Sequence, residues 1–144
     1  MLQNDRTELS EQALAFLESG KITQARDLYE QICRADKNDF DSWMMLGAIH
    51  AELGNITEAI SCLRQSITLQ PDYPEAHCNL GHSLRAQGNY QEALAHFQKA
   101  AEIKPDYAEA WLAMGGINGI LGLFDKSEAC CRKAIELQPD SLDA

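Results

Sequence analysis

The chain has 144 residues, of which 45% are hydrophobic and 24% charged, so it carries enough apolar surface to fold and is not wholly disordered. Its net charge of −10, from 22 acidic and 12 basic residues, opposes binding to nucleic acid, whose phosphates require a basic surface. No apolar stretch approaches the roughly 18 to 20 residues of a membrane span, and no secretory signal opens the chain, so we expect a cytoplasmic protein without a membrane span.

The cysteines do not form a recognisable framework. They are odd in number, two of them are adjacent, and no Cys-x-x-Cys pair occurs, which argues against both disulfides and a zinc site. We expect them to be reduced thiols in the core. They are Cys33, Cys62, Cys78, Cys130 and Cys131.

The sequence repeats itself every 34 residues. Proline followed by aspartate forms one column, glycine a second, and small residues two more. These columns are Pro71, Pro105 and Pro139; Gly20, Gly54, Gly88 and Gly122; Ala25, Ala59, Ala93 and Ser127; and Ala13, Gly47, Gly81 and Gly115. Because the columns are in phase, they define four repeats, which are residues 6–39, 40–73, 74–107 and 108–141.

Each repeat is predicted to hold two helices. In the second repeat apolar residues recur at three- and four-residue spacing, and Gly54 provides a left-handed residue that ends the first helix. Pro71 ends the second helix because proline cannot continue the hydrogen-bond ladder, and Pro74 suits the first turn of the next.

Two asparagines open second helices. Asn55 is followed three residues later by Glu58, and Asn89 by Glu92, so both pairs resemble a capping box.

The small-residue columns predict close helix packing. Where two antiparallel helices approach most closely, one must present a small residue so that a bulky side chain of the other can enter. Leu63 and Phe97 are among the bulky partners, while Cys131 in the same column is undersized and is expected to leave room for a following repeat.

In these columns the chain resembles the tetratricopeptide repeat (TPR), as found in bacterial and O-GlcNAc transferase-like proteins. The resemblance spans about residues 6–141. The matching positions are Trp43, Leu46, Gly47, Gly54, Ala59, Leu63 and Pro71; His77, Leu80, Gly81, Gly88, Ala93, Phe97, Ala100 and Pro105; and Trp111, Met114, Gly115, Gly122, Ala134 and Pro139. It implies one all-α domain over residues 1–144, a right-handed α-solenoid of four helix-turn-helix repeats.

The resemblance also implies a concave groove lined by the first helix of each repeat. The groove residues that it indicates are Leu14, Met44, Met45, Ala48, Cys78, Asn79, His82, Arg85, Leu112, Gly116, Gly119 and Ile120. Members that clamp the carboxylate of chaperone tails use lysines and asparagines at several of these positions, where this chain has Leu14, Met45, Cys78 and His82. An acidic chaperone tail is therefore not an expected partner.

For three features of the groove the sequence is compatible with two interpretations. Asn79 is similar to one rung of the asparagine ladder that holds peptide backbones, or is a solvated residue. Gly116 and Gly119 allow a ligand to approach the helix closely, or reflect drift near the end of an array. Met44 and Met45 form an adaptable apolar patch, or one of them packs into the core.

No catalytic constellation is present in the sequence. Cys78 and His82 are four residues apart on one helical face and could touch a metal, but two ligands are insufficient for zinc. We therefore expect no enzyme activity, cofactor or metal.

The favoured function is an interaction module or scaffold that binds a protein or peptide with apolar and basic residues. Residues 142–144 resemble the start of a fifth repeat, which suggests that the chain is the beginning of a longer protein, or a short protein that forms a homo-oligomer through its uncapped last repeat. Two alternatives follow: the substrate-recruiting arm of a glycosyltransferase or sulfotransferase, and a self-assembly module.

Overall fold

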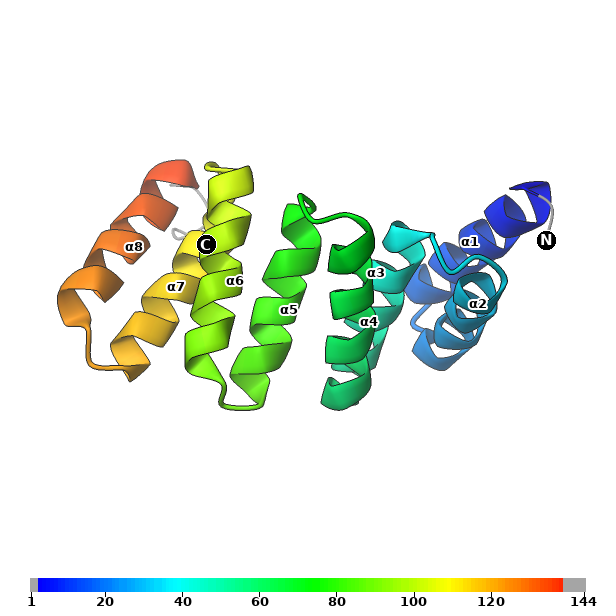
Figure 1. Ribbon diagram of the computed structural model, residues 1–144, viewed down its shortest axis with the longest axis horizontal. Coiled ribbons are helices and arrows are strands. Elements are labelled where there is room, and N and C mark those ends of the chain that lie inside the picture. Colours follow the sequence, from blue (N-terminus) through cyan, green and yellow to red (C-terminus); the bar gives the residue numbers. More distant parts are fainter. Residues whose placement is uncertain (1–2, 139–144) are drawn as a thin grey trace. The chain divides into compact units, whose positions relative to one another are not determined.

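The computed structural model describes residues 3–138, which form eight α-helices and no strand (Figure 1). The predicted all-α arrangement of four helix-turn-helix repeats is confirmed for these residues. The helices are α1 (Gln3–Glu18), α2 (Ile22–Ala35), α3 (Phe40–Glu52), α4 (Ile56–Leu69), α5 (Pro74–Ala86), α6 (Tyr90–Ile103), α7 (Ala108–Ile120) and α8 (Phe124–Leu137).

The helices belong to two compact units. The first unit holds α1 to α4 and ends at Pro71, and the second begins at Asp72 and holds α5 to α8. In each unit consecutive helices pair as hairpins, α1 with α2 and α3 with α4, then α5 with α6 and α7 with α8. Across each repeat boundary inside a unit, α2 contacts α3 and α6 contacts α7.

Glycine and proline set the helix ends where the sequence predicts. Gly54 adopts φ +81°, and after it the Asn55 amide donates to the His50 carbonyl at 2.8 Å, which closes α3. Helix α4 ends at Leu69, two residues before Pro71, and Pro74 occupies the first turn of α5. Pro139 and residues 142–144, which carry the predicted fifth repeat, lie outside the described residues.

The predicted capping boxes are wrong. Neither Asn55 nor Asn89 makes a side-chain capping bond to the backbone. The Asn89 side chain instead donates to the Glu92 carboxylate at 2.9 Å, so the two polar groups satisfy each other rather than the helix end. The cap in the first unit is Asp39, whose carboxylate accepts from the Ser42 amide at 3.1 Å.

The small-residue columns lie where the hairpins are tightest. A Cβ added to Gly81 would meet three ring atoms of Phe97 at 2.8–2.9 Å, and one added to Gly47 would meet Leu63 at 2.6 Å. Both partner side chains are completely buried. The predicted entry of a bulky side chain opposite a glycine is therefore confirmed.

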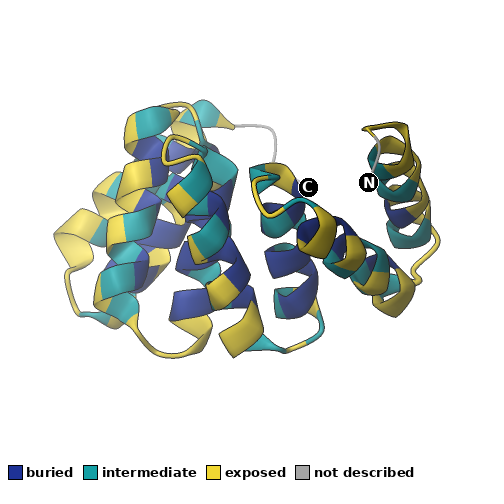
Figure 2. Ribbon diagram, turned by 45° about the vertical axis from the view of Figure 1, so that its right-hand side comes forward, coloured by how far each residue is buried: buried dark blue, intermediate teal, exposed yellow. Residues whose placement is uncertain are grey.

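The same hydrogen bond recurs in each unit. The indole N–H of Trp43 donates to the Lys37 carbonyl at 3.0 Å, and that of Trp111 donates to the Pro105 carbonyl at the same distance. The equivalent position in the third repeat is His77, which is buried and stacks on His96 of α6 with ring centroids 5.4 Å apart. Figure 2 shows how the buried residues of each unit line the facing sides of the paired helices.

Candidate functional site

The predicted groove residues of the first unit differ in exposure. Leu14 on α1 is 45% exposed, and Ala48 on α3 is partly exposed. Met44 is only 8% exposed, and Met45 is partly buried against the apolar core of this unit. In the first unit, Leu14 thus offers the larger accessible apolar side chain, and the methionines lie mostly inside.

On α7 the predicted residues form an open apolar row. Leu112, Gly116 and Ile120 are spaced by four residues, so they follow one side of the helix. Leu112 is 54% exposed and Ile120 is 59% exposed. A Cβ at Gly116 would meet nothing within 4 Å, whereas one at Gly119 would meet the Ser127 hydroxyl at 3.4 Å. The bare backbone at Gly116 is therefore accessible to a neighbouring molecule.

The predicted residues of α5 lie beside this row, because α5 contacts α7 directly. Cys78 is completely buried, Asn79 and His82 are partly buried, and Arg85 is exposed. We define the α5–α7 surface by five of the predicted residues on these two helices. It consists of His82, Arg85, Leu112, Gly116 and Ile120.

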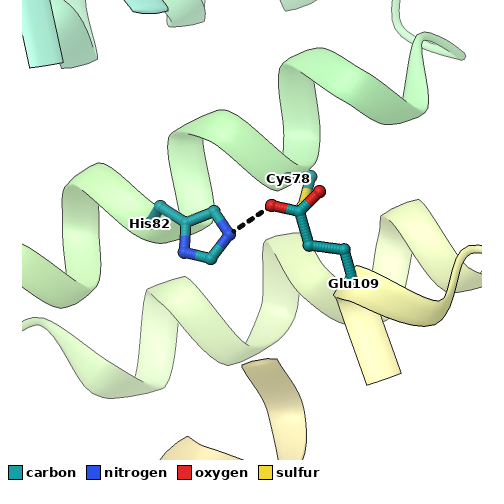
Figure 3. Close-up of side chains that lie close together, drawn as sticks. All are labelled: Cys78, His82 and Glu109. Carbon is teal, nitrogen blue, oxygen red and sulfur yellow. Dashed lines mark hydrogen bonds and ion pairs between the residues drawn. The ribbon is translucent and has the colours of Figure 1, made fainter. Parts of the chain in front are cut away.

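Three residues with different donor atoms converge at one edge of this surface. His82 Nε2 lies 2.9 Å from the Glu109 carboxylate, and the sulfur of Cys78 lies within 4.8 Å of both ligand atoms (Figure 3). The His82 ring also packs edge-on against Phe97, with centroids 4.9 Å apart, which holds the ring in place.

The thiol of this group is protonated near neutral pH. Burial, reinforced by the negative charge of Glu109, raises the pKa of Cys78 to about 12. Burial also raises the pKa of the neighbouring Tyr107 phenol, which forms a hydrogen bond with Cys78.

Sequence reasoning paired Cys78 with His82 but missed Glu109. The carboxylate comes from the next repeat, 27 residues after His82, and only the contact between α5 and α7 brings it to the pair. Counting one repeat forward from Glu75, in the first turn of α5, reaches Glu109 in the first turn of α7, but nothing in the sequence shows that its side chain turns toward His82.

Grooves flank the helices of the second unit. One, of about 720 Å³, runs over α6, α7 and α8 and is lined by Leu94, Trp111, Leu121 and Leu123 among others. Another, of about 650 Å³, lies at the ends of α7 and α8 and is lined by Leu112, Cys131, Ala134 and Ile135 together with Tyr107 and Glu109. Cys131 lies in this lining, and a Cβ added to Gly115 would meet its sulfur at 2.5 Å, so Cys131 packs against the glycine of its own hairpin.

Sequence comparison identifies the family. Profiles described as tetratricopeptide repeat match residues 9–39, 74–107 and 108–141, and one described as TPR repeat matches residues 47–84. The chain is a tetratricopeptide repeat protein.

Solved structures share the fold of this TPR protein. The crystal structure of MamA superposes with a TM-score of 0.89 at 21% identity, covering 98% of this chain and 82% of that one. The crystal structure of YrrB, described as a TPR protein with an unusual peptide-binding site, gives 0.83 at 26% identity, covering 95% and 71%. TTC0263, a thermophilic TPR protein in Thermus thermophilus, gives 0.79 at 21% identity, covering 93% and 75%.

Two findings are negative. No curated protein sequence matches the chain. Among the described residues, no helix has both the length and the apolar character needed to cross a membrane.

Proposed function

We propose that this TPR protein is a non-enzymatic interaction module and that it binds a peptide or protein through the α5–α7 surface. The observation that carries the proposal is the open apolar row of α7. A chain in water gains nothing by exposing more than half of Leu112 and of Ile120 on one helix side, with an uncovered glycine between them.

The row also has a suitable shape for a bound chain. Because Gly116 has no side chain, a ligand side chain or backbone can approach the α7 backbone between two apolar contacts. Two apolar side chains on either side of an open glycine can bury an apolar side chain of the ligand. A few buried side chains of this kind supply most of the affinity at protein interfaces.

The charge of the chain favours a basic ligand. The net charge is −10, and Glu109 is an exposed acid next to the row. Opposite charges steer partners toward each other and raise the association rate. We therefore expect peptides that combine apolar and basic residues. The peptide-binding site for which YrrB is described, in a chain 26% identical to this one, supports a peptide as the ligand.

The test uses a displayed library of random peptides selected on the whole chain. Peptides selected on the parent protein are then measured by fluorescence anisotropy against Leu112→Glu and Gly116→Glu. Phe124→Glu is the matched control, because Phe124 is 72% exposed but lies at the start of α8 rather than on the α5–α7 surface.

We expect both surface variants to weaken peptide binding at least tenfold and the Phe124 variant to leave it unchanged. We also expect basic residues to be enriched among the selected peptides. Equal binding by all the variants would show that the ligand contacts another surface. The more conservative Gly116→Ala separates the two interpretations of this glycine: lost affinity supports close ligand approach, and unchanged affinity supports drift.

Self-assembly is a second candidate, favoured by the groove of about 650 Å³ at the ends of α7 and α8. Leu112 and Ile135 line it and are 54% and 48% exposed, as expected where another repeat would stack. Sedimentation velocity over a concentration series distinguishes the candidates. A second copy on this groove gives dimers that Ile135→Glu abolishes, whereas a strictly monomeric parent excludes it.

The recruiting-arm alternative requires the same binding surface and a catalytic domain in the same reading frame. The coding sequence after Ala144 decides it.

A further inference from the structure

The group formed by Cys78, His82 and Glu109 has the composition of a metal site. It combines one sulfur, one imidazole nitrogen and one carboxylate oxygen, all within 4.8 Å of one another. These are the three ligand types that zinc accepts in proteins. We propose that Cys78, His82 and Glu109 bind a zinc ion, with solvent in the fourth position. The group shares His82 with the α5–α7 surface, but the test of this proposal measures metal binding and requires no peptide.

Helix α5 carries two of the ligand side chains at a favourable spacing. Cys78 and His82 are four residues apart on α5, so both side chains leave the helix on one side, as do histidine ligands at the same spacing in zinc-binding helices. Helix α7 supplies the third ligand from its first turn. Two rigid helices that contact each other therefore fix the positions from which all three side chains extend.

Zinc binding requires changes in the distances between the ligand atoms, including a closer approach of the Cys78 sulfur wherever it lies more than about 3.7 Å from the other two. Zinc bonds of about 2.0–2.3 Å in tetrahedral geometry place neighbouring ligand atoms about 3.2–3.7 Å apart. His82 Nε2 and Glu109 Oε1 are 2.9 Å apart, so an ion between them must separate the two atoms by a few tenths of an ångström. The Glu109 side chain is 55% exposed, so packing does not prevent the rotation that this requires.

The charges balance when the metal binds. The Cys78 S–H bond breaks, a sulfur–zinc bond forms, and the proton passes to solvent. A thiolate and the Glu109 carboxylate then neutralise the two charges of the ion, while His82 binds as neutral imidazole. Burial keeps the thiol protonated in the absence of metal, so the ion must displace a proton whose pKa is about 12.

The surroundings provide contacts around the ligands. The Tyr107 hydroxyl forms a hydrogen bond with Cys78, and the His82 ring rests against Phe97. Such outer contacts orient the ligands of zinc sites. The exposed side of Glu109 leaves an entry path from solvent.

The test titrates the whole reduced chain with Co²⁺ alone, then with Zn²⁺ in competition with a chromophoric chelator. Cobalt bound to a cysteine gives a sulfur-to-metal charge-transfer absorption, which an ion pair between His82 and Glu109 does not. We expect one equivalent to bind with this absorption, and zinc to displace it.

Three variants and one control decide the outcome. Cys78→Ala should abolish the absorption. Glu109→Gln and His82→Gln should each lower the zinc affinity at least as much as the loss of an outer contact does in known sites, which is about 10- to 100-fold. Cys130→Ala is the control, because Cys130 is a more exposed thiol outside the group and should leave binding unchanged.

The proposal is overturned if the parent gives no charge-transfer absorption, if Cys78→Ala retains it, or if Glu109→Gln binds zinc as tightly as the parent. Circular dichroism checks the fold of Cys78→Ala. Should that variant unfold, Glu109→Gln still decides, because its side chain is mostly in solvent and its loss leaves the core intact.

Discussion

Two glycines of one unit should respond oppositely to the same added methyl group. Gly81 and Gly116 both lie inside helices, α5 and α7. A Cβ at Gly81 falls 2.8–2.9 Å from three ring atoms of the fully buried Phe97, whereas a Cβ at Gly116 meets nothing within 4 Å.

The magnitudes follow from these surroundings. Overpacking a tight core costs about 1–3 kcal/mol, and three contacts below 3.0 Å with a fully buried ring place Gly81→Ala in the upper half of that range. Alanine is about 1 kcal/mol more favourable than glycine inside a helix, which offsets part of this cost, so Gly81→Ala should lower the free energy of unfolding by about 1–2 kcal/mol. At Gly116 only the propensity gain remains, and Gly116→Ala should stabilise by about 0.5–1 kcal/mol.

Urea unfolding followed by circular dichroism measures both variants. The midpoint should fall for Gly81→Ala and rise for Gly116→Ala, with unchanged slopes, because the surface exposed on unfolding is the same. The packing argument is refuted if Gly81→Ala is as stable as Gly116→Ala, since Phe97 would then have moved at no cost.

Two further predictions concern a helix cap and a buried thiol. Asp39→Ala removes the acceptor for the Ser42 amide and should cost about 0.5–2 kcal/mol in urea unfolding, while Asn89→Ala, which has no capping bond, should cost less; equal losses would contradict the assignment of the cap. Burial raises the pKa of Cys33 from 9.0 to about 12, so the folded chain keeps a proton that the unfolded chain releases, and the stabilisation present below pH 9 is lost as the pH rises from 9 toward 12. The free energy of unfolding should therefore fall more steeply with pH in the parent than in Cys33→Ala, by up to about 1.4 kcal/mol per pH unit, and parallel curves would exclude the shift.

The repeat architecture was predictable because it depends on local chemistry. Left-handed glycine, as at Gly54 and Gly88, and proline, as at Pro71, act through their own backbone, so their positions in the sequence mark the helix ends wherever the helices pack. The columns of small residues likewise predicted that bulky side chains such as Phe97 enter where the paired helices approach most closely, and the contact of Gly81 with Phe97 is one such place.

Polar pairing was less predictable. Asn89 and Glu92 have the spacing of a capping box, but the Asn89 backbone N–H already donates to the Leu84 carbonyl at 2.9 Å, and the Glu92 carboxylate accepts from the Asn89 side-chain amide instead. The sequence shows which groups are neighbours on a helix and not which of several partners each one takes.

The family, the four helix pairs and the residues available on each first helix could all be read from the order of the amino acids. Helix packing then settled which of these residues remain accessible and which converge: Met44 turns inward, Leu112 stays in solvent, and Glu109 joins Cys78 and His82. The physical reason is that helical periodicity fixes the direction of a side chain around its own axis, whereas exposure and side-chain convergence depend on the neighbouring helix that packs against it.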